Sequence, residues 1–185
     1  MTGPSRNVLR ASILVPILAA GLFLRAAADA GVNPPHVDLS LIPLADAIVI
    51  GDPAAKYRLV VFSDPDCPYC AKYHEEIRKV VSRDPRIAFH VKVYPNNGSP
   101  LTYRKAVSIV CGKSETLLED SYAGKAVPPP TCGTSVVEDT MRLVHRLNIA
   151  STPSTVLPDG RVIYGFQEAD TLLRLMAERK RQPRP

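Results

Sequence analysis

The sequence contains no tryptophan, and aromatic side chains make up only 6% of its 185 residues. Proteins that bind unpaired bases stack them on aromatic rings, so this composition argues against a single-stranded nucleic acid as partner. The net charge of +5 is modest, and the basic residues are dispersed except at the two ends, which argues against nucleic acid in general. No internal repeat is present, so repeat architectures are excluded.

Cysteine is also scarce, with four residues, but a chain of this length can bury a core without disulfides. The hydrophobic share of 45% and the charged share of 22% are ordinary for a globular domain and exclude wholesale disorder. The 18 prolines are unusually many and predict short elements that end sharply. Composition therefore predicts one folded domain but indicates no function. The positions of the cysteines carry that information.

The N-terminus has the order of an export signal. Arg6 and Arg10 precede an uncharged apolar run from Ala11 to Leu24, and a stretch rich in alanine follows it. The run is shorter than the roughly 20 apolar residues of a spanning helix. We therefore expect residues 1–30 to be a cleaved signal peptide, with an uncleaved anchor or a buried helix as alternatives. An exported protein would work in the periplasm, where disulfides persist.

Beyond residue 30 the hydrophobic pattern alternates between strand and helix periods. The expected elements, in chain order, are an extended arm over 31–56 that ends in an edge strand at 47–50, a strand at 59–62, a helix at 67–82, a strand at 89–93, helices at 101–111, 115–123 and 136–147, strands at 154–157 and 161–164, and a helix at 170–180. This α/β order is β-α-β, a helical insert over about 98–148, and β-β-α. It is the arrangement of a thioredoxin-like domain, placed here at 57–185.

The strongest chemical signal is Cys67-Pro68-Tyr69-Cys70, at the expected start of a helix. Two sulfurs at this spacing can close a small disulfide ring. Unpaired N–H groups and the helix dipole favour an anion at Cys67, and a thiolate is the species that attacks a disulfide. We therefore expect Cys67 to be the nucleophile and Cys70 the resolving thiol. Pro68 stiffens the helix start, and Tyr69 presents an amphipathic ring beside the sulfurs.

Other uses of this motif are less well supported. A c-type haem site needs histidine after the second cysteine, where Ala71 stands, and a structural zinc site needs a second close pair of cysteines. His74 could join Cys67 and Cys70 around an ion, although a solvated helix residue is the favoured interpretation.

Two carboxylates precede the motif, Asp64 and Asp66. Their negative charge would oppose a thiolate at Cys67, and either could relay a proton to Cys70. The interpretation favoured here is that both are solvated turn residues.

Thr152-Pro153 stands directly before the expected strand at 154–157. In thioredoxin-like folds a cis-proline precedes this strand and faces the cysteine motif, so we expect a cis bond here. The alternative is a trans proline at the start of an edge strand.

The second pair of cysteines is Cys111, at the end of an expected helix, and Cys132, after a segment of three prolines. A bridge between them would close a loop of about 20 residues and contribute about 3 kcal/mol on the chain-entropy estimate. We favour a structural disulfide that holds the helical insert together. A second redox pair that relays electrons from Cys67 is the alternative.

The chain resembles the DsbC/DsbG group of periplasmic thiol-disulfide interchange proteins from about Ile48 to Glu178. The matching stretches, in order, are 60–64, Cys67 to Cys70, Tyr94-Pro95, the Cys111/Cys132 pair, 123–125, 151–153, Asp159-Gly160 and 164–167. Their joint order is specific. The resemblance implies a thioredoxin fold with an inserted helical lobe, catalytic Cys67 and Cys70, and a cis-proline loop at Thr152 and Pro153 that contacts substrate.

The resemblance also has a departure, because members of that group carry an N-terminal dimerisation domain. Residues 31–56 are too few for such a domain. We therefore expect a lone catalytic domain, with a monomer favoured, in which isomerase activity is in doubt.

The function expected from the sequence is an exported thiol-disulfide oxidoreductase that reduces, isomerises or forms disulfides in envelope proteins. Client contacts are expected at Pro68, Tyr69, Thr152 and Pro153, and a membrane redox partner would recycle the two thiols. No cofactor, metal or nucleic acid is expected. The alternative from another class is a chaperone or assembly factor that works without redox chemistry.

Overall fold

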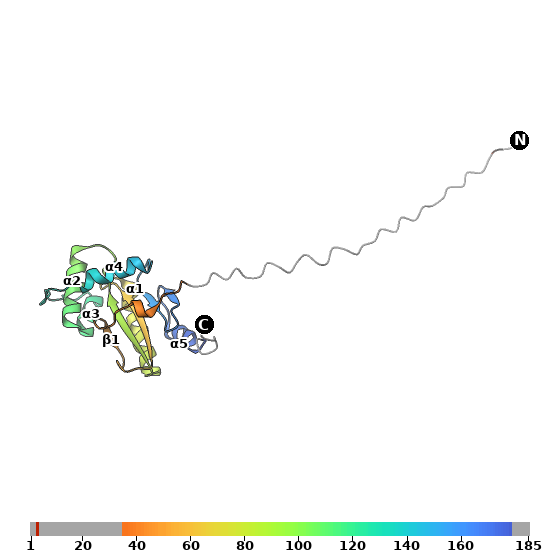
Figure 1. Ribbon diagram of the computed structural model, residues 1–185, viewed down its shortest axis with the longest axis horizontal. Coiled ribbons are helices and arrows are strands. Elements are labelled where there is room, and N and C mark those ends of the chain that lie inside the picture. The colour runs from red at the N-terminus through yellow and green to blue at the C-terminus, as the bar shows by residue number, and fades with distance from the viewer. Residues whose placement is uncertain (1–2, 4–34, 179–185) are drawn as a thin grey trace. The chain divides into compact units, whose positions relative to one another are not determined.

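The computed structural model describes Gly3 and residues 35–178 (Figure 1). Its centre is a five-stranded sheet with the strand order β1-β3-β2-β4-β5. The strands are β1 (Ile48–Ile50), β2 (Tyr57–Ser63), β3 (Ile87–Val93), β4 (Ser154–Val156) and β5 (Val162–Tyr164). Only β2 and β3 run parallel, and the other neighbours are antiparallel. The expected signal peptide over residues 1–30 lies outside the described residues.

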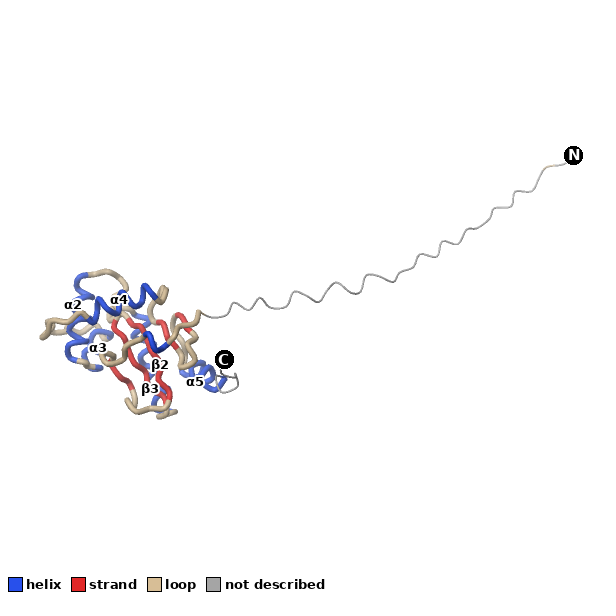
Figure 2. Tube along the Cα trace, in the orientation of Figure 1, coloured by secondary structure: helices blue, strands red, loops and turns tan. Residues whose placement is uncertain are grey.

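Five α-helices surround this sheet in the described part of the chain (Figure 2). They are α1 (Pro68–Arg83), α2 (Pro100–Gly112), α3 (Glu115–Tyr122), α4 (Val136–Arg146) and α5 (Ala169–Glu178), and a 3-10 turn covers Leu39–Leu41. The expected helical lobe consists of α2, α3 and α4, which lie together in both views. The α/β thioredoxin-like order predicted from the sequence is therefore confirmed. None of the helices in residues 35–178 combines the length and apolar character that crossing a membrane requires.

The two faces of the sheet carry separate apolar clusters because neighbouring side chains of a strand point to opposite faces. Leu59 and Val61 of β2 belong to one cluster, which α1 and α5 cover. Val60 and Phe62 belong to the other cluster. All four side chains are essentially inaccessible to solvent. A strand buried on both faces explains why this part of the sequence is a continuous apolar run.

The residues expected to form an N-terminal arm are part of the folded domain wherever the structure describes them. The edge strand is present as β1, antiparallel to β3. Ahead of it, Val37 and Ile42 are buried in the second cluster beside α4. The backbone N–H of Val37 also donates to the carbonyl oxygen of Gly160 at 2.8 Å. Gly160 has a φ of +90°, and a side chain there would collide with His36.

Candidate active site

Cys67 caps the N-terminus of α1, directly after the turn that follows β2. Its Sγ atom accepts a hydrogen bond from the backbone N–H of Cys70 at 3.4 Å, and Pro68 occupies the first turn. Helix-start N–H groups have no partner within the helix, so they are free to face a sulfur anion. Cys67 is half-buried, whereas Cys70 is buried beneath it. One sulfur is therefore open to attack a partner, and the other is screened from solvent.

The loop at Thr152-Pro153 lies against the cysteine motif. The peptide bond between these residues is cis, and the Cys67 thiol faces the carbonyl oxygen of Thr152 at 3.8 Å. This contact exists because β4 pairs antiparallel with β2, with Ser154 opposite Phe62. The end of β2 leads into the cysteine turn, and the start of β4 follows the proline loop. The two segments therefore lie side by side at the same end of the sheet, where β2 finishes and β4 begins.

The surroundings of Cys70 include two hydroxyl groups to which the sequence analysis assigned no role. Burial raises the pKa of the Cys70 thiol to about 12, and the neighbouring Cys67 adds to the shift. The Ser63 hydroxyl and the backbone N–H of Asp64 act in the opposite direction by stabilising a Cys70 thiolate. Ser63 Oγ is itself hydrogen-bonded to the phenol oxygen of Tyr122 at 2.6 Å. Tyr122 is the last residue of α3, so the position of this helix in the fold brings its phenol to Ser63 at the end of β2.

The interpretation of Asp64 as a solvated turn residue is wrong, because only 3% of the residue is exposed. One of its carboxylate oxygens accepts the backbone N–H of Asp66 at 2.8 Å, and the other accepts that of Asn96 at 2.7 Å. The buried acid therefore satisfies two N–H groups and joins the cysteine turn to the chain that follows β3.

Asp66 is also held in place by hydrogen bonds, although it stays partly exposed. Its carboxylate accepts hydrogen bonds from the Thr102 hydroxyl and the Lys105 ammonium, both on α2. Burial pushes the pKa of Asp66 upward, but the hydrogen bonds from Lys105 and Thr102 outweigh it and leave the pKa below its usual value. The turn ahead of Cys67 is thereby joined to the helical lobe.

Two partly or fully exposed aromatic side chains lie near the cysteine motif or the proline loop. Tyr69 is within the motif, and Phe166 follows Gly165, whose backbone N–H donates to the carbonyl oxygen of Pro153 at 2.8 Å. Tyr69 is 63% exposed, so its ring is available to a partner molecule. Phe166 is 37% exposed and meets the buried Tyr73 ring edge-on at 6.3 Å. Such rings offer apolar contact area to a polypeptide without demanding a particular sequence.

His74 does not join the two thiols around an ion. It is 5% exposed, so the favoured solvated interpretation is wrong as well. Its Nε2 atom faces Glu115 and Glu119 at 3.5 and 3.4 Å, and Arg78 pairs with the same two carboxylates. These residues form an ion-pair network between α1 and α3, and neither thiol belongs to the group of possible ligands around His74.

The second pair of cysteines, Cys111 and Cys132, is joined in a disulfide with an S–S distance of 2.02 Å. Cys111 lies on α2, and Cys132 lies in the chain between α3 and α4. The bond therefore links two parts of the helical lobe and is separate from the Cys67 motif.

Comparisons with known proteins agree with this geometry. A model of the thioredoxin-like domain family matches residues 44–180. The chain is 30% identical over 139 residues to the thiol:disulfide interchange protein DsbC of Salmonella typhimurium, and 27% identical over 138 residues to DsbC of Escherichia coli K12. Each alignment covers 74% of this chain and 57% of the relative, so the chain spans little more than half their length. The expected resemblance to DsbC is confirmed.

Solved structures show the same fold. A disulfide interchange protein from Neisseria gonorrhoeae superposes with a TM-score of 0.62 at 25% identity, covering 74% of this chain and 97% of that one. The catalytic domain of Proteus mirabilis ScsC superposes with a TM-score of 0.62 at 20% identity, covering 78% and 94%.

Proposed function

The chain belongs to the thioredoxin-like domain family, and we propose that it catalyses thiol-disulfide exchange with cysteine residues of other proteins. The observation that carries the proposal is the position of Cys67. Its sulfur caps a helix N-terminus, faces the Thr152 carbonyl at 3.8 Å, and covers a second, buried thiol. An attacking thiolate needs these three features, namely stabilisation, a surface where the client can dock, and a resolving partner.

The reaction proceeds in two exchanges. The Cys67 thiolate attacks one sulfur of a client disulfide, so the client's S–S bond breaks and a mixed disulfide forms while the other client sulfur leaves as a thiolate. Cys70 then loses its proton, which the departing client thiolate can take. The Cys70 thiolate attacks Cys67 Sγ, which closes the Cys67–Cys70 disulfide and releases the client. The client gains two electrons, the motif loses two, and the reverse sequence forms client disulfides.

The residues around the two sulfurs would dock the client and keep Cys67 in position. The Thr152-Pro153 loop offers backbone groups to an extended client, and Tyr69 offers exposed apolar area beside Cys67. Pro68 lacks an N–H and starts α1 with a fixed backbone angle, which keeps Cys67 at the cap. The Cys111–Cys132 disulfide stays outside this cycle and stabilises the helical lobe.

The protein's compartment and partners complete the proposal. Residues 1–30 would direct export, residues 31–56 would lead into the domain, and envelope proteins with cysteines would be the clients. A membrane redox partner, a dithiol or disulfide protein, would recycle Cys67 and Cys70. The curated relatives are named thiol:disulfide interchange proteins, and one similar structure is titled a periplasmic thioredoxin-like protein. The mass of the mature N-terminus would test export, and an intact Met1 would contradict cleavage.

Trapping the mixed disulfide tests the function. The Cys70→Ala variant, incubated with a disulfide-containing client, should accumulate a covalent complex that reductant releases and a nonreducing gel detects. Cys67→Ala should form no complex and should lose exchange activity. Unimpaired exchange in Cys67→Ala would overturn the proposal.

A further inference from the structure

A shallow groove lies between α2 and the segment that follows α3, with a cavity volume of about 290 Å³. One wall is the N-terminal part of α2, with Leu101, Arg104 and Lys105. The other wall is the segment 127–130, which consists of a valine and three prolines. The volume lies near the lower end of the range for small-molecule pockets, so the groove fits a few side chains of an extended chain.

The proline wall is stiff, and a disulfide links it to the α2 wall. Consecutive prolines have restricted φ angles and no backbone N–H, so the segment 127–130 is stiff and presents ring surfaces. Cys132 follows this segment after one intervening residue, and its disulfide partner Cys111 lies on α2. The disulfide therefore ties the proline wall to the helix that forms the opposite wall.

The groove is linked to the turn that precedes the attacking sulfur through one ion pair. Lys105 lines the groove, and its ammonium is bound to the carboxylate of Asp66. Asp66 directly precedes Cys67 in the sequence. Residues that flank a client cysteine bound at Cys67 are therefore within reach of this groove.

The charge of the groove is positive. The described residues that line it include two basic side chains and no acidic one. Asp66 balances the charge of Lys105, whereas the exposed Arg104 forms no ion pair with an acidic side chain of the described residues. An acidic side chain placed here would complement Arg104, while Leu101 and the prolines would cover its apolar neighbours.

We propose that this groove binds the segment of the client that flanks its reactive cysteine, and that Arg104 selects clients with an acidic residue in that segment. The inference rests on the proposed disulfide exchange and adds a substrate class to it.

The test compares two synthetic peptides that each carry one cysteine joined by a disulfide to a chromogenic aromatic thiol. One peptide has Glu on both sides of the cysteine, and the other has Lys in the same places. The reduced protein should release the thiol from the Glu peptide with a kcat/KM about fivefold higher at 0.15 M salt, where long-range steering is screened. In Arg104→Glu the two peptides should react with equal kcat/KM, or the Lys peptide should react faster.

The matched control is Arg174→Glu, an exposed arginine on α5, which lines no part of the groove. Arg174→Glu changes the net charge by the same amount as Arg104→Glu. It should keep the wild-type ratio of the kcat/KM values for the Glu and Lys peptides. Equal ratios in the wild type and Arg104→Glu would overturn the inference, and so would an equal loss of the ratio in both arginine variants. Reduction of hydroxyethyl disulfide by the wild type tests the proposed function separately, because that molecule has no flanking segment to fill the groove.

Discussion

The Sγ atom of Cys67 lies 3.8 Å from the carbonyl oxygen of Thr152, although the two residues are 85 positions apart in the sequence. The contact spans the junction between the two halves of the fold, where β4 pairs with β2. In the proposed reaction, a client segment docked on the Thr152 loop would lie beside the sulfur that attacks it. Proximity of this kind lowers the entropic cost of the exchange reaction.

Ser63→Ala should slow the second exchange by about tenfold, because it removes a hydroxyl that stabilises the Cys70 thiolate. The pKa of Cys70, about 12 in the wild type, should rise further, so less thiolate is present at any given pH. Quenched-flow measurement of mixed-disulfide decay between pH 6 and 9 checks this. Both proteins should react faster as the pH rises, with the variant's profile displaced to higher pH. The control is Ser82→Ala at an exposed position of α1, and superimposable profiles for all three proteins would contradict the role of Ser63.

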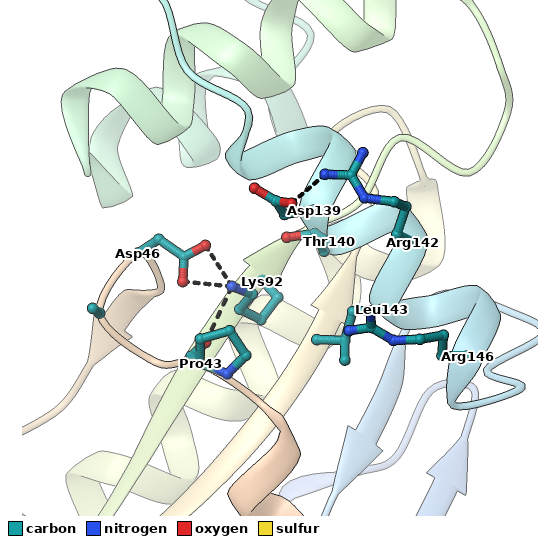
Figure 3. Close-up of a pocket in the computed structure, with 9 residues that line it drawn as sticks. Pro43, Asp46, Lys92, Asp139, Thr140, Arg142, Leu143 and Arg146 are labelled. Atoms are coloured by element: carbon teal, nitrogen blue, oxygen red, sulfur yellow. Dashed lines mark hydrogen bonds and ion pairs between the residues drawn. The ribbon is translucent and has the colours of Figure 1, made fainter.

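Asp46→Ala should destabilise the fold by about 3 kcal/mol, because it leaves a buried ammonium without its counter-charge. Figure 3 shows Lys92 bonded to both carboxylate oxygens of Asp46 and to the carbonyl of Pro43. The Lys92 side chain is 2% exposed. Lys92→Met should cost less, since it removes the charge that must be buried and keeps an apolar stem.

Urea unfolding of the two variants and of Glu75→Ala measures this difference. Glu75 is exposed on α1, so its variant should stay within about 0.5 kcal/mol of the wild type. An Asp46→Ala variant as stable as the Glu75 control would show that the buried ion pair contributes nothing.

Removal of the second disulfide by the pair Cys111→Ala and Cys132→Ala should lower the free energy of unfolding by about 3 kcal/mol. The bonded residues are 21 positions apart, and the loss follows from the larger conformational freedom of the unfolded chain. Reduction of hydroxyethyl disulfide at 25 °C should persist, because Cys67 and Cys70 are untouched. Lost turnover with unchanged stability would instead mark this pair as a second redox centre.

Asp66 should make the protein more sensitive to acid. Its hydrogen bonds with Lys105 and Thr102 hold the folded-state pKa below the ordinary value, despite an upward push from burial. The stability that Asp66 contributes is therefore fully present above the unfolded pKa near 3.9, and is lost as the pH falls through the folded pKa. Urea midpoints measured from pH 7 to pH 2.5 should fall less steeply below pH 4 in Asp66→Asn than in the wild type. Parallel curves would contradict this linkage.

Local structure was predictable because its causes are local. The apolar spacing of Tyr73, Ile77, Val80 and Val81 predicts one buried face of α1. The structure buries the first three and leaves Val81 half-buried. The positions of the helices α2, α3 and α4 agree with the predicted ranges to within about one residue, because prolines and capping residues mark their ends.

Burial of polar residues was less predictable. Solvated positions were expected for Asp64 and His74, and both residues are buried. Asp64 is buried because two backbone N–H groups, one from the chain after β3, satisfy its carboxylate. His74 is buried because α3 packs over α1 and supplies carboxylates to its ring. A charged or polar side chain gives no sign in the sequence of the partners that a distant element supplies.

The sequence by itself determined the order of the elements, the sharp ends of the helices and the two-residue spacing that puts Cys67 at a helix start. Hydrophobic period, proline geometry and helix capping act over a few residues, so they can be read directly from the chain. Only the tertiary structure decided which atom of the expected proline loop meets Cys67, namely the Thr152 carbonyl oxygen, that Tyr122 is hydrogen-bonded to Ser63, and that Arg104 lines a groove between α2 and the proline segment. Strand order and helix packing create these contacts, and both depend on burying apolar surface from segments far apart in the chain.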